Sequence, residues 1–225
     1  YEKDGMYYMI QGGRDEKDRG CALLFQSTNL KNWKWYDTIY PEKTFGYMWE
    51  CPDLFEIDGQ QIMTCCPQGV EQKGYDYQNV YQCGYFPVNF DLVNKKYEFG
   101  TFVEFDKGFD IYATQTFQDE QGRRILIGWM GLPEIDYPTD KNHWAHCLTI
   151  PRELTLKGKK IIQKPISELK KLRKTKDTFN FNLESEKVDL NMDGLSYELI
   201  AEFSDYDNDF GLELRTGKNE KIVIF

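Results

Sequence analysis

The 225-residue chain has little of several features that mark common classes of protein. It has two histidines, His143 and His146, which are too few for a histidine-rich metal centre. Its formal net charge of −9 argues against binding to nucleic acid or to an anionic membrane surface. No apolar run approaches the roughly 18–20 residues of a membrane-spanning helix. The sequence therefore predicts no metal, no nucleic acid and no membrane as partners.

Cysteine motifs and cofactor motifs are missing as well. Six cysteines occur, but no C-x-x-C pair, which argues against a zinc ribbon or a thioredoxin-type site. A chain of this length can build a core without disulfides, and we expect reduced thiols in a cytoplasmic protein. No P-loop, no G-x-G-x-x-G and no G-x-S-x-G sequence occurs, so no cofactor is predicted.

Helical periodicity is scarce, and short alternating or apolar runs dominate the chain. These runs are bounded by Gly, Asp, Asn and Pro, and they predict strands at residues 6–11, 22–27, 61–65, 97–105, 124–129 and 147–150. A turn-forming pair that ends in Gly5, Gly59 or Gly122 precedes three β-rich runs, as two-residue hairpin loops require. The spacing suits four-stranded propeller blades of about 40–50 residues with loop insertions. An irregular β-sandwich is the alternative.

The composition changes near Pro165. Residues 165–173 are cationic and begin with proline, which predicts one short helical segment in a linker. Strand-like runs return at residues 179–183, 197–203, 211–215 and 222–225. We therefore predict a first β domain over residues 1–164, a linker over 165–175 and a second β domain over 176–225.

The sharpest local feature is the segment 47–55, in which Glu50 lies between Trp49 and Cys51. Apolar neighbours disfavour the charged form of a carboxyl group, and a general acid must hold its proton near neutral pH. Glu50 is therefore a candidate general acid, and a solvated glutamate on a β-turn is the alternative. Strand alternation predicts that Asp53 faces the opposite way and accepts backbone hydrogen bonds after Pro52.

Aromatic residues make up 16% of the chain, more than a plain core needs. Asp110 and Tyr112 occupy alternating strand positions and hence share a face. Trp129 ends an apolar strand and is a candidate flat wall for a sugar ring, with a place in the core as the alternative. Arg14 and Asp15 lie among charged neighbours, which indicates a solvated loop.

Residues 49–55, Trp-Glu-Cys-Pro-Asp-Leu-Phe, resemble the Glu-Cys-Pro motif of glycoside hydrolase family 32. That family includes invertases, fructan hydrolases and sucrose-6-phosphate hydrolases. Other segments resemble the family in the same order, namely residues 3–9, 110–117, 128–130 and 144–154, so that the resemblance covers about residues 1–215. Residues 46–49 and 78–85 look most like the cytoplasmic, bacterial sucrose-6-phosphate hydrolase branch.

The resemblance implies part of a five-bladed β-propeller, followed by the start of a β-sandwich. It implies a retaining hydrolase of terminal β-D-fructofuranosyl bonds in sucrose, sucrose 6-phosphate or fructans, with two carboxyl groups about 5–5.5 Å apart. Glu50 matches the acid/base of the family. The residues then expected to bind the sugar are Tyr112, Trp129, Asp110 and Trp49.

Two other functions stay open at this point. Another propeller glycosidase, such as an arabinanase or xylosidase relative, would share a pocket of three carboxylates but should lack Glu-Cys-Pro with these neighbours. A carbohydrate-binding protein that has lost catalysis would keep the pocket. An Asn-Asp-Pro-type motif upstream would exclude the second of these functions for the parent protein.

The chain lacks both the Asn-Asp-Pro-type motif, whose Asp is the family's nucleophile, and the Arg-Asp-Pro motif. We expect both upstream of Tyr1 in a longer parent protein. We predict that purified residues 1–225 alone do not hydrolyse sucrose, because a covalent mechanism without its nucleophile loses many orders of magnitude in rate. Release of glucose by this chain, abolished by Glu50→Gln, would contradict the prediction.

Overall fold

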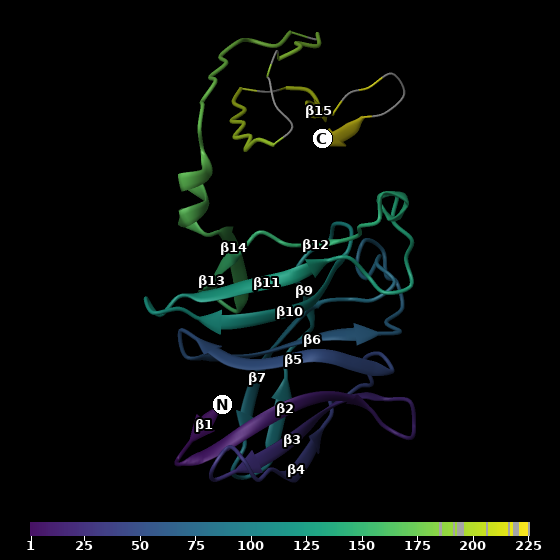
Figure 1. Cartoon of the computed structure of the whole chain (residues 1–225), viewed down its shortest axis with the longest axis vertical. Helices are drawn as coiled ribbons and strands as arrows, with labels where there is room; N and C mark the ends of the chain where they lie inside the picture. Colours follow the sequence, from purple (N-terminus) through teal and green to yellow (C-terminus); the bar gives the residue numbers. More distant parts are fainter. Residues whose placement is uncertain are drawn as a thin grey trace. The chain divides into compact units, whose positions relative to one another are not determined.

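The first sheet forms from the N-terminal strands in antiparallel order β1-β2-β3-β4 (Figure 1). Its strands are β1 (Glu2–Lys3), β2 (Met6–Arg14), β3 (Gly20–Ser27) and β4 (Lys34–Ile39). Asp4 and Gly5, with φ of 52° and 76°, form the two-residue loop between β1 and β2. A type I′ turn needs positive φ at both central residues, so the predicted tight hairpin is confirmed here.

The figure shows a computed structural model that describes residues 1–184, 186–190, 192, 196–205, 207–215, 217 and 221–224. The fold is mostly β, and the chain divides into two units, Tyr1–Leu172 and Arg173–Phe225. Among the described residues, no helix has the length and apolar character needed to cross a membrane.

The second sheet has the order β5-β6-β7-β8, with β9 also paired to β7. Its strands are β5 (Met48–Ile57), β6 (Gln60–Gln68), β7 (Gly84–Asp91), β8 (Lys96–Phe99) and β9 (Val103–Glu104). Asp58 and Gly59, with φ of 49° and 79°, again form a two-residue hairpin loop. The strand predicted at 97–105 is divided into β8 and β9, because the pairing with β7 shifts by one residue between Val88↔Phe99 and Tyr85↔Val103.

The third sheet has the order β10-β11-β13-β14, with β12 also paired to β11. Its strands are β10 (Ile111–Gln118), β11 (Arg124–Met130), β12 (Cys147–Leu148), β13 (Arg152–Lys157) and β14 (Lys160–Pro165). The two-residue loop predicted at Gly122 is wrong, because Gln118 pairs with Arg124 and leaves residues 119–123 as the loop. Two short 3-10 helices, η1 (Asp140–Asn142) and η2 (Ser167–Leu172), complete this region.

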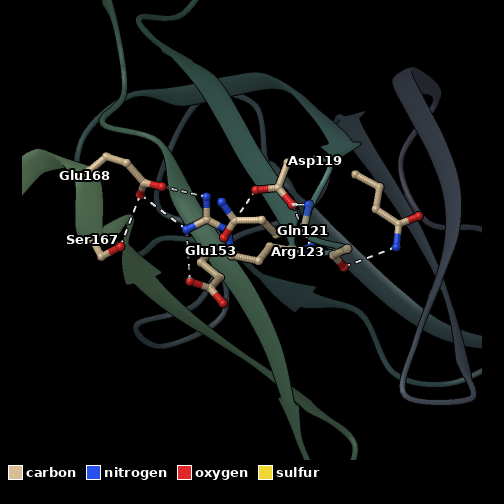
Figure 2. A network of polar contacts seen from close by, with 8 residues as sticks. Asp119, Gln121, Arg123, Glu153, Ser167 and Glu168 are labelled. Carbon is tan, nitrogen blue, oxygen red and sulfur yellow. Dashed lines mark hydrogen bonds and ion pairs between the residues drawn. The ribbon is translucent and has the colours of Figure 1, made fainter.

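Arg123 joins that loop to the end of the first unit (Figure 2). Its guanidinium lies 2.7 Å from the Asp119 carboxylate and 2.8 Å from the Glu168 carboxylate of η2, with Glu153 of β13 at 4.0 Å. The hydrogen bonds from Arg123 lower the pKa of Glu168 to about 2. The ion-pair network therefore holds η2, where a short helical segment was predicted, against the third sheet.

Strand β5 packs against β2 on one side and against β10 on the other, so the second sheet lies between the first and third (Figure 1). Alternation along β6 buries Met63 and Cys65 in the cluster shared with the first sheet, and Ile62 and Cys66 in the cluster shared with the third. Both faces of the second sheet are thus covered. The three sheets are arranged like successive propeller blades, and the described residues do not close a ring.

The second unit contains one antiparallel pair, β15 (Leu212–Leu214) with β16 (Ile222–Ile224). The described residues at 179–183 and 197–203, where strands were predicted, are not in strands. Position 225, the end of another predicted strand, lies outside the described residues. The domain boundaries and the β-sandwich stay predictions.

Gly12 allows β2 to approach the start of β5 closely. A Cβ at position 12 would lie 2.1 Å from the Trp49 carbonyl oxygen and 3.3 Å from Glu50 Cα. A Cβ at the neighbouring Gly13 would meet its nearest atom, Cys21 Sγ, at 3.5 Å, which is ordinary contact. The two glycines therefore form a matched pair for a stability test.

We predict that Gly12→Ala destabilises the first unit by about 1–3 kcal/mol, because the two strands must move apart. Gly13→Ala should be neutral or slightly stabilising, since it only restricts the unfolded chain. Urea unfolding followed by tryptophan fluorescence reports on the first unit, because all five tryptophans lie within residues 33–144. Equal loss of stability in both variants would show that the close approach at Gly12 does not matter.

Candidate active site

A β-bulge in β5 sets the direction of the candidate acid. Glu50 pairs with Cys66 and Asp53 pairs with Thr64, so β5 has one residue more than β6 between these pairs. Cys51 has a φ of 48° at this point, in the left-handed region. The extra residue interrupts the alternation of side chains along β5, so Glu50 and Asp53 both accept hydrogen bonds from side chains of β10. The prediction that Glu50 and Asp53 lie on opposite faces is therefore wrong.

The carboxylate of Glu50 is held by a chain of two hydrogen bonds. The Tyr112 hydroxyl donates to Glu50 Oε2 at 2.8 Å, and Gln68 Nε2 donates to the Tyr112 oxygen at 3.1 Å. Burial raises the pKa of the Tyr112 phenol, so this group remains a proton donor to the carboxylate. Glu50 itself is only partly buried. The arrangement orients one carboxylate oxygen and keeps the residue within reach of solvent.

Asp53 has a different partner from the one predicted. Its Oδ2 accepts a hydrogen bond from the Thr116 hydroxyl on β10, and not from backbone groups of the turn after Pro52. Tyr112 and Thr116 thus hold Glu50 and Asp53, respectively, from the same neighbouring strand. Two side-chain bonds therefore fix β5 relative to β10 around the bulge.

Tyr112 and Trp129 lie next to each other near Glu50. They are paired across β10 and β11, and their ring centroids are 6.4 Å apart. Tyr112 is only 2% exposed, so it offers its hydroxyl to Glu50 and very little ring surface to a sugar. Trp129 is partly exposed and has His146 at a centroid distance of 4.9 Å on one side. Of this aromatic pair, Trp129 has the more suitable surface for a sugar ring.

Asp110 lies just before β10, in the left-handed region with a φ of 57°. Its Oδ2 accepts a hydrogen bond from the Tyr137 hydroxyl at 2.7 Å, and the Leu132 N–H donates to that hydroxyl at 3.0 Å. The Tyr137 ring also lies 4.6 Å from the His146 ring. Asp110 therefore holds the loop after β11, on which His146 lies against Trp129.

Trp49 is a core residue and not part of the predicted sugar site. It has no exposed surface, its indole N–H donates to the Phe45 carbonyl at 2.7 Å, and its ring lies 5.6 Å from Phe86. A Cβ at Gly20 would come within 2.5 Å of this indole, so the ring is closely packed against the first sheet. Trp49 therefore packs in the core on the opposite face of β5 from Glu50, and it does not contact substrate as predicted.

Sequence reasoning missed two polar partners of the site, Gln68 and Thr116. Neither residue type signals catalysis, and each becomes relevant only through a contact with a distant strand. The pairing of Gln68 with Met48 places it beside the start of β5, and only knowledge of that register could have identified it. In the part of the chain that the structure describes, no group of three His, Cys, Asp or Glu side chains could hold a metal ion.

The site can therefore support proton transfer beside an aromatic surface. Glu50 is partly exposed and oriented by a neutral phenol, which suits a group that gives and takes a proton. Hydrolysis with retention needs a second carboxyl group as nucleophile on the other side of the scissile bond. Asp53 does not suit that role, since it lies on the same strand and is bonded to Thr116.

Residues 1–165 match the family described as the glycosyl hydrolases family 32 N-terminal domain. The chain is 44% identical over 210 residues to the sucrose-6-phosphate hydrolase of Bacillus subtilis (strain 168), covering 90% of this chain and 42% of that protein. It thus spans less than half the length of this relative.

Solved structures resemble the chain over most of its length. The GH32 β-fructofuranosidase of Bombyx mori has a TM-score of 0.73 at 36% identity, covering 78% of this chain and 38% of that one. A variant of that enzyme has been solved in complex with sucrose. The sucrose-6-phosphate hydrolase of Lactobacillus gasseri has a TM-score of 0.72 at 34% identity, covering 77% and 36%. The chain therefore belongs to glycosyl hydrolase family 32, and residues 1–165 correspond to the family's N-terminal domain.

Proposed function

We propose that Glu50 is the acid/base of a retaining hydrolase that cleaves terminal β-D-fructofuranosyl bonds. The observation that carries the proposal is the 2.8 Å hydrogen bond from Tyr112 to Glu50 at the bulge of the Glu-Cys-Pro segment. The relatives named as sucrose-6-phosphate hydrolases support sucrose 6-phosphate as the substrate. The sucrose complex of the Bombyx mori enzyme supports sucrose as a second substrate.

The proposed mechanism uses Glu50 twice. In the first step the protonated carboxyl group donates its proton to the glycosidic oxygen as the nucleophile attacks the anomeric carbon. In the second step the Glu50 carboxylate takes a proton from the water that attacks the fructosyl-enzyme. Because Tyr112 donates to Oε2, the transferable proton belongs on Oε1. Gln68 keeps the phenol turned toward Glu50 in both steps.

The proposal extends to the surroundings of the site. We propose a five-bladed propeller around this pocket, a C-terminal β-sandwich and a nucleophilic Asp from an Asn-Asp-Pro-type motif outside the present chain. Trp129 then forms one wall of the fructose site, and Asp110 supports that wall through Tyr137. The six free thiols support a cytoplasmic location, where reduced cysteines are usual.

In a longer protein that joins this chain to the upstream motif, Glu50→Gln should lower kcat for sucrose 6-phosphate by about 10²–10⁴-fold. The amide keeps an acceptor for the Tyr112 hydroxyl but cannot exchange a proton at pH 7. Release of glucose 6-phosphate is the measurement. Glu56→Gln is the matched control, because Glu56 is an exposed residue of the same strand and should leave the rate unchanged. A folded Glu50→Gln variant of near wild-type rate would refute the assignment.

A further inference from the structure

Three cysteines near Glu50, which the proposed hydrolysis does not use, form a row across β5, β6 and the start of β7. Cys51 is the bulged residue of β5, Cys66 pairs with Glu50 from β6, and Cys83 directly precedes β7. All are free thiols. Cys51 is partly exposed, whereas Cys66 and Cys83 are buried, with 0% and 3% exposed surface. The row therefore leads from the surface of the site into the core.

The three thiols lie close together where β5 pairs with β6. Cys51 follows Glu50, the residue that pairs with Cys66, and packs against the apolar cluster that contains Cys66 and Cys83. Cys66 Sγ lies 3.4 Å from Cys83 Sγ, and Cys83 Sγ lies 3.1 Å from the Thr114 hydroxyl oxygen. Cysteines that lie beside each other on paired strands can fall within the Cα separation of about 4.4–6.8 Å that a disulfide spans. Of the three, only Cys51 is open to a reagent from solvent.

The environments of the Cys51 and Cys66 thiols differ. The hydrogen bond from Cys66 lowers the pKa of the Cys51 thiol, whereas burial raises the pKa of Cys66 well above its ordinary value. The thiolate is the form that attacks an oxidant, and Cys51 is the one thiol of the three that solvent reaches, so Cys51 reacts first. Cys66 is then the resolving partner, since it pairs with the residue before Cys51 and is shielded from solvent.

We propose that Cys51 and Cys66 are a modification site, a dithiol pair that a hydroperoxide converts reversibly to a disulfide. With hydrogen peroxide, the Cys51 thiolate attacks one peroxide oxygen, and the O–O bond breaks to give Cys51 sulfenic acid and, after protonation, water. The Cys66 sulfur then attacks the Cys51 sulfur, and the hydroxyl leaves as a second water. The two thiols lose two electrons, which reduce the peroxide to two waters.

The cross-link would join Cys51, which follows Glu50, to Cys66, which pairs with Glu50. The bulge that carries the acid/base would then be tied covalently to β6, and the only partly exposed thiol of the row would be removed from the site. The chemistry at sulfur rests on the placement and exposure of the two thiols, and only its effect on hydrolysis rests on the proposed function. Oxidation at this pair would therefore regulate the same site.

The test uses the reduced 225-residue chain with equimolar hydrogen peroxide. The expected result is a fall in titratable thiols from six to four, a mass lower by two hydrogens, and full reversal by dithiothreitol. A glutamate-specific protease cuts after Glu56, between Cys51 and Cys66, so the cross-linked peptides can be identified directly. Because thiols are counted and not sugar, the outcome is independent of the Glu50 assignment.

Two variants sharpen the test. Cys66→Ser should form no disulfide and should leave Cys51 as a sulfenic acid that dimedone traps. Cys65→Ser is the matched control, because Cys65 is equally buried but lies in the cluster on the other face of β6, and this variant should still lose two thiols. Should Cys66→Ser fail to fold, the peptide map of the unaltered chain decides alone. Oxidation of Cys147 with Cys51 and Cys66 still reduced, or of Cys51 to sulfinic acid without a cross-link, would overturn the proposal.

Discussion

The extra residue of β5 at Cys51 determines where the carboxylate of Glu50 can point. Without it, strict alternation would turn Glu50 and Asp53 to opposite faces of the second sheet. With it, Glu50 and Asp53 are both bonded from β10, by Tyr112 and Thr116 respectively. The bulge thus places a carboxyl group between two sheets, where it has a hydrogen-bond donor on one side and partial access to solvent.

The opposite face of β5 supplies the rigidity that this placement needs. Trp49 is fully buried against the first sheet, and Gly12 lets the backbone of β2 come close to the peptide that joins Trp49 to Glu50. A proton donor must be held in a narrow range of positions to transfer a proton in a transition state. The packed aromatic core on one face therefore serves the polar site on the other.

The sequence predicted the local features well, because they depend on neighbouring residues. The β class and the tight turns at Gly5 and Gly59 follow from short alternating runs and turn-forming pairs. The bulge could not be predicted, since it depends on how β5 and β6 pair. For the same reason Gln68 was missed and Trp49 was misassigned to the sugar, because only the packed sheets decide which face is core.

Chemical rescue by azide tests the central claim, that Glu50 is the acid/base, most directly. In a longer protein with the nucleophile present, Glu50→Ala should still form the fructosyl-enzyme from a substrate with a good leaving group, but water would attack it slowly. Azide needs no general base, so it should restore turnover and give β-fructosyl azide, with the configuration retained. Rescue absent in Glu50→Ala but present in Asp53→Ala would contradict the account.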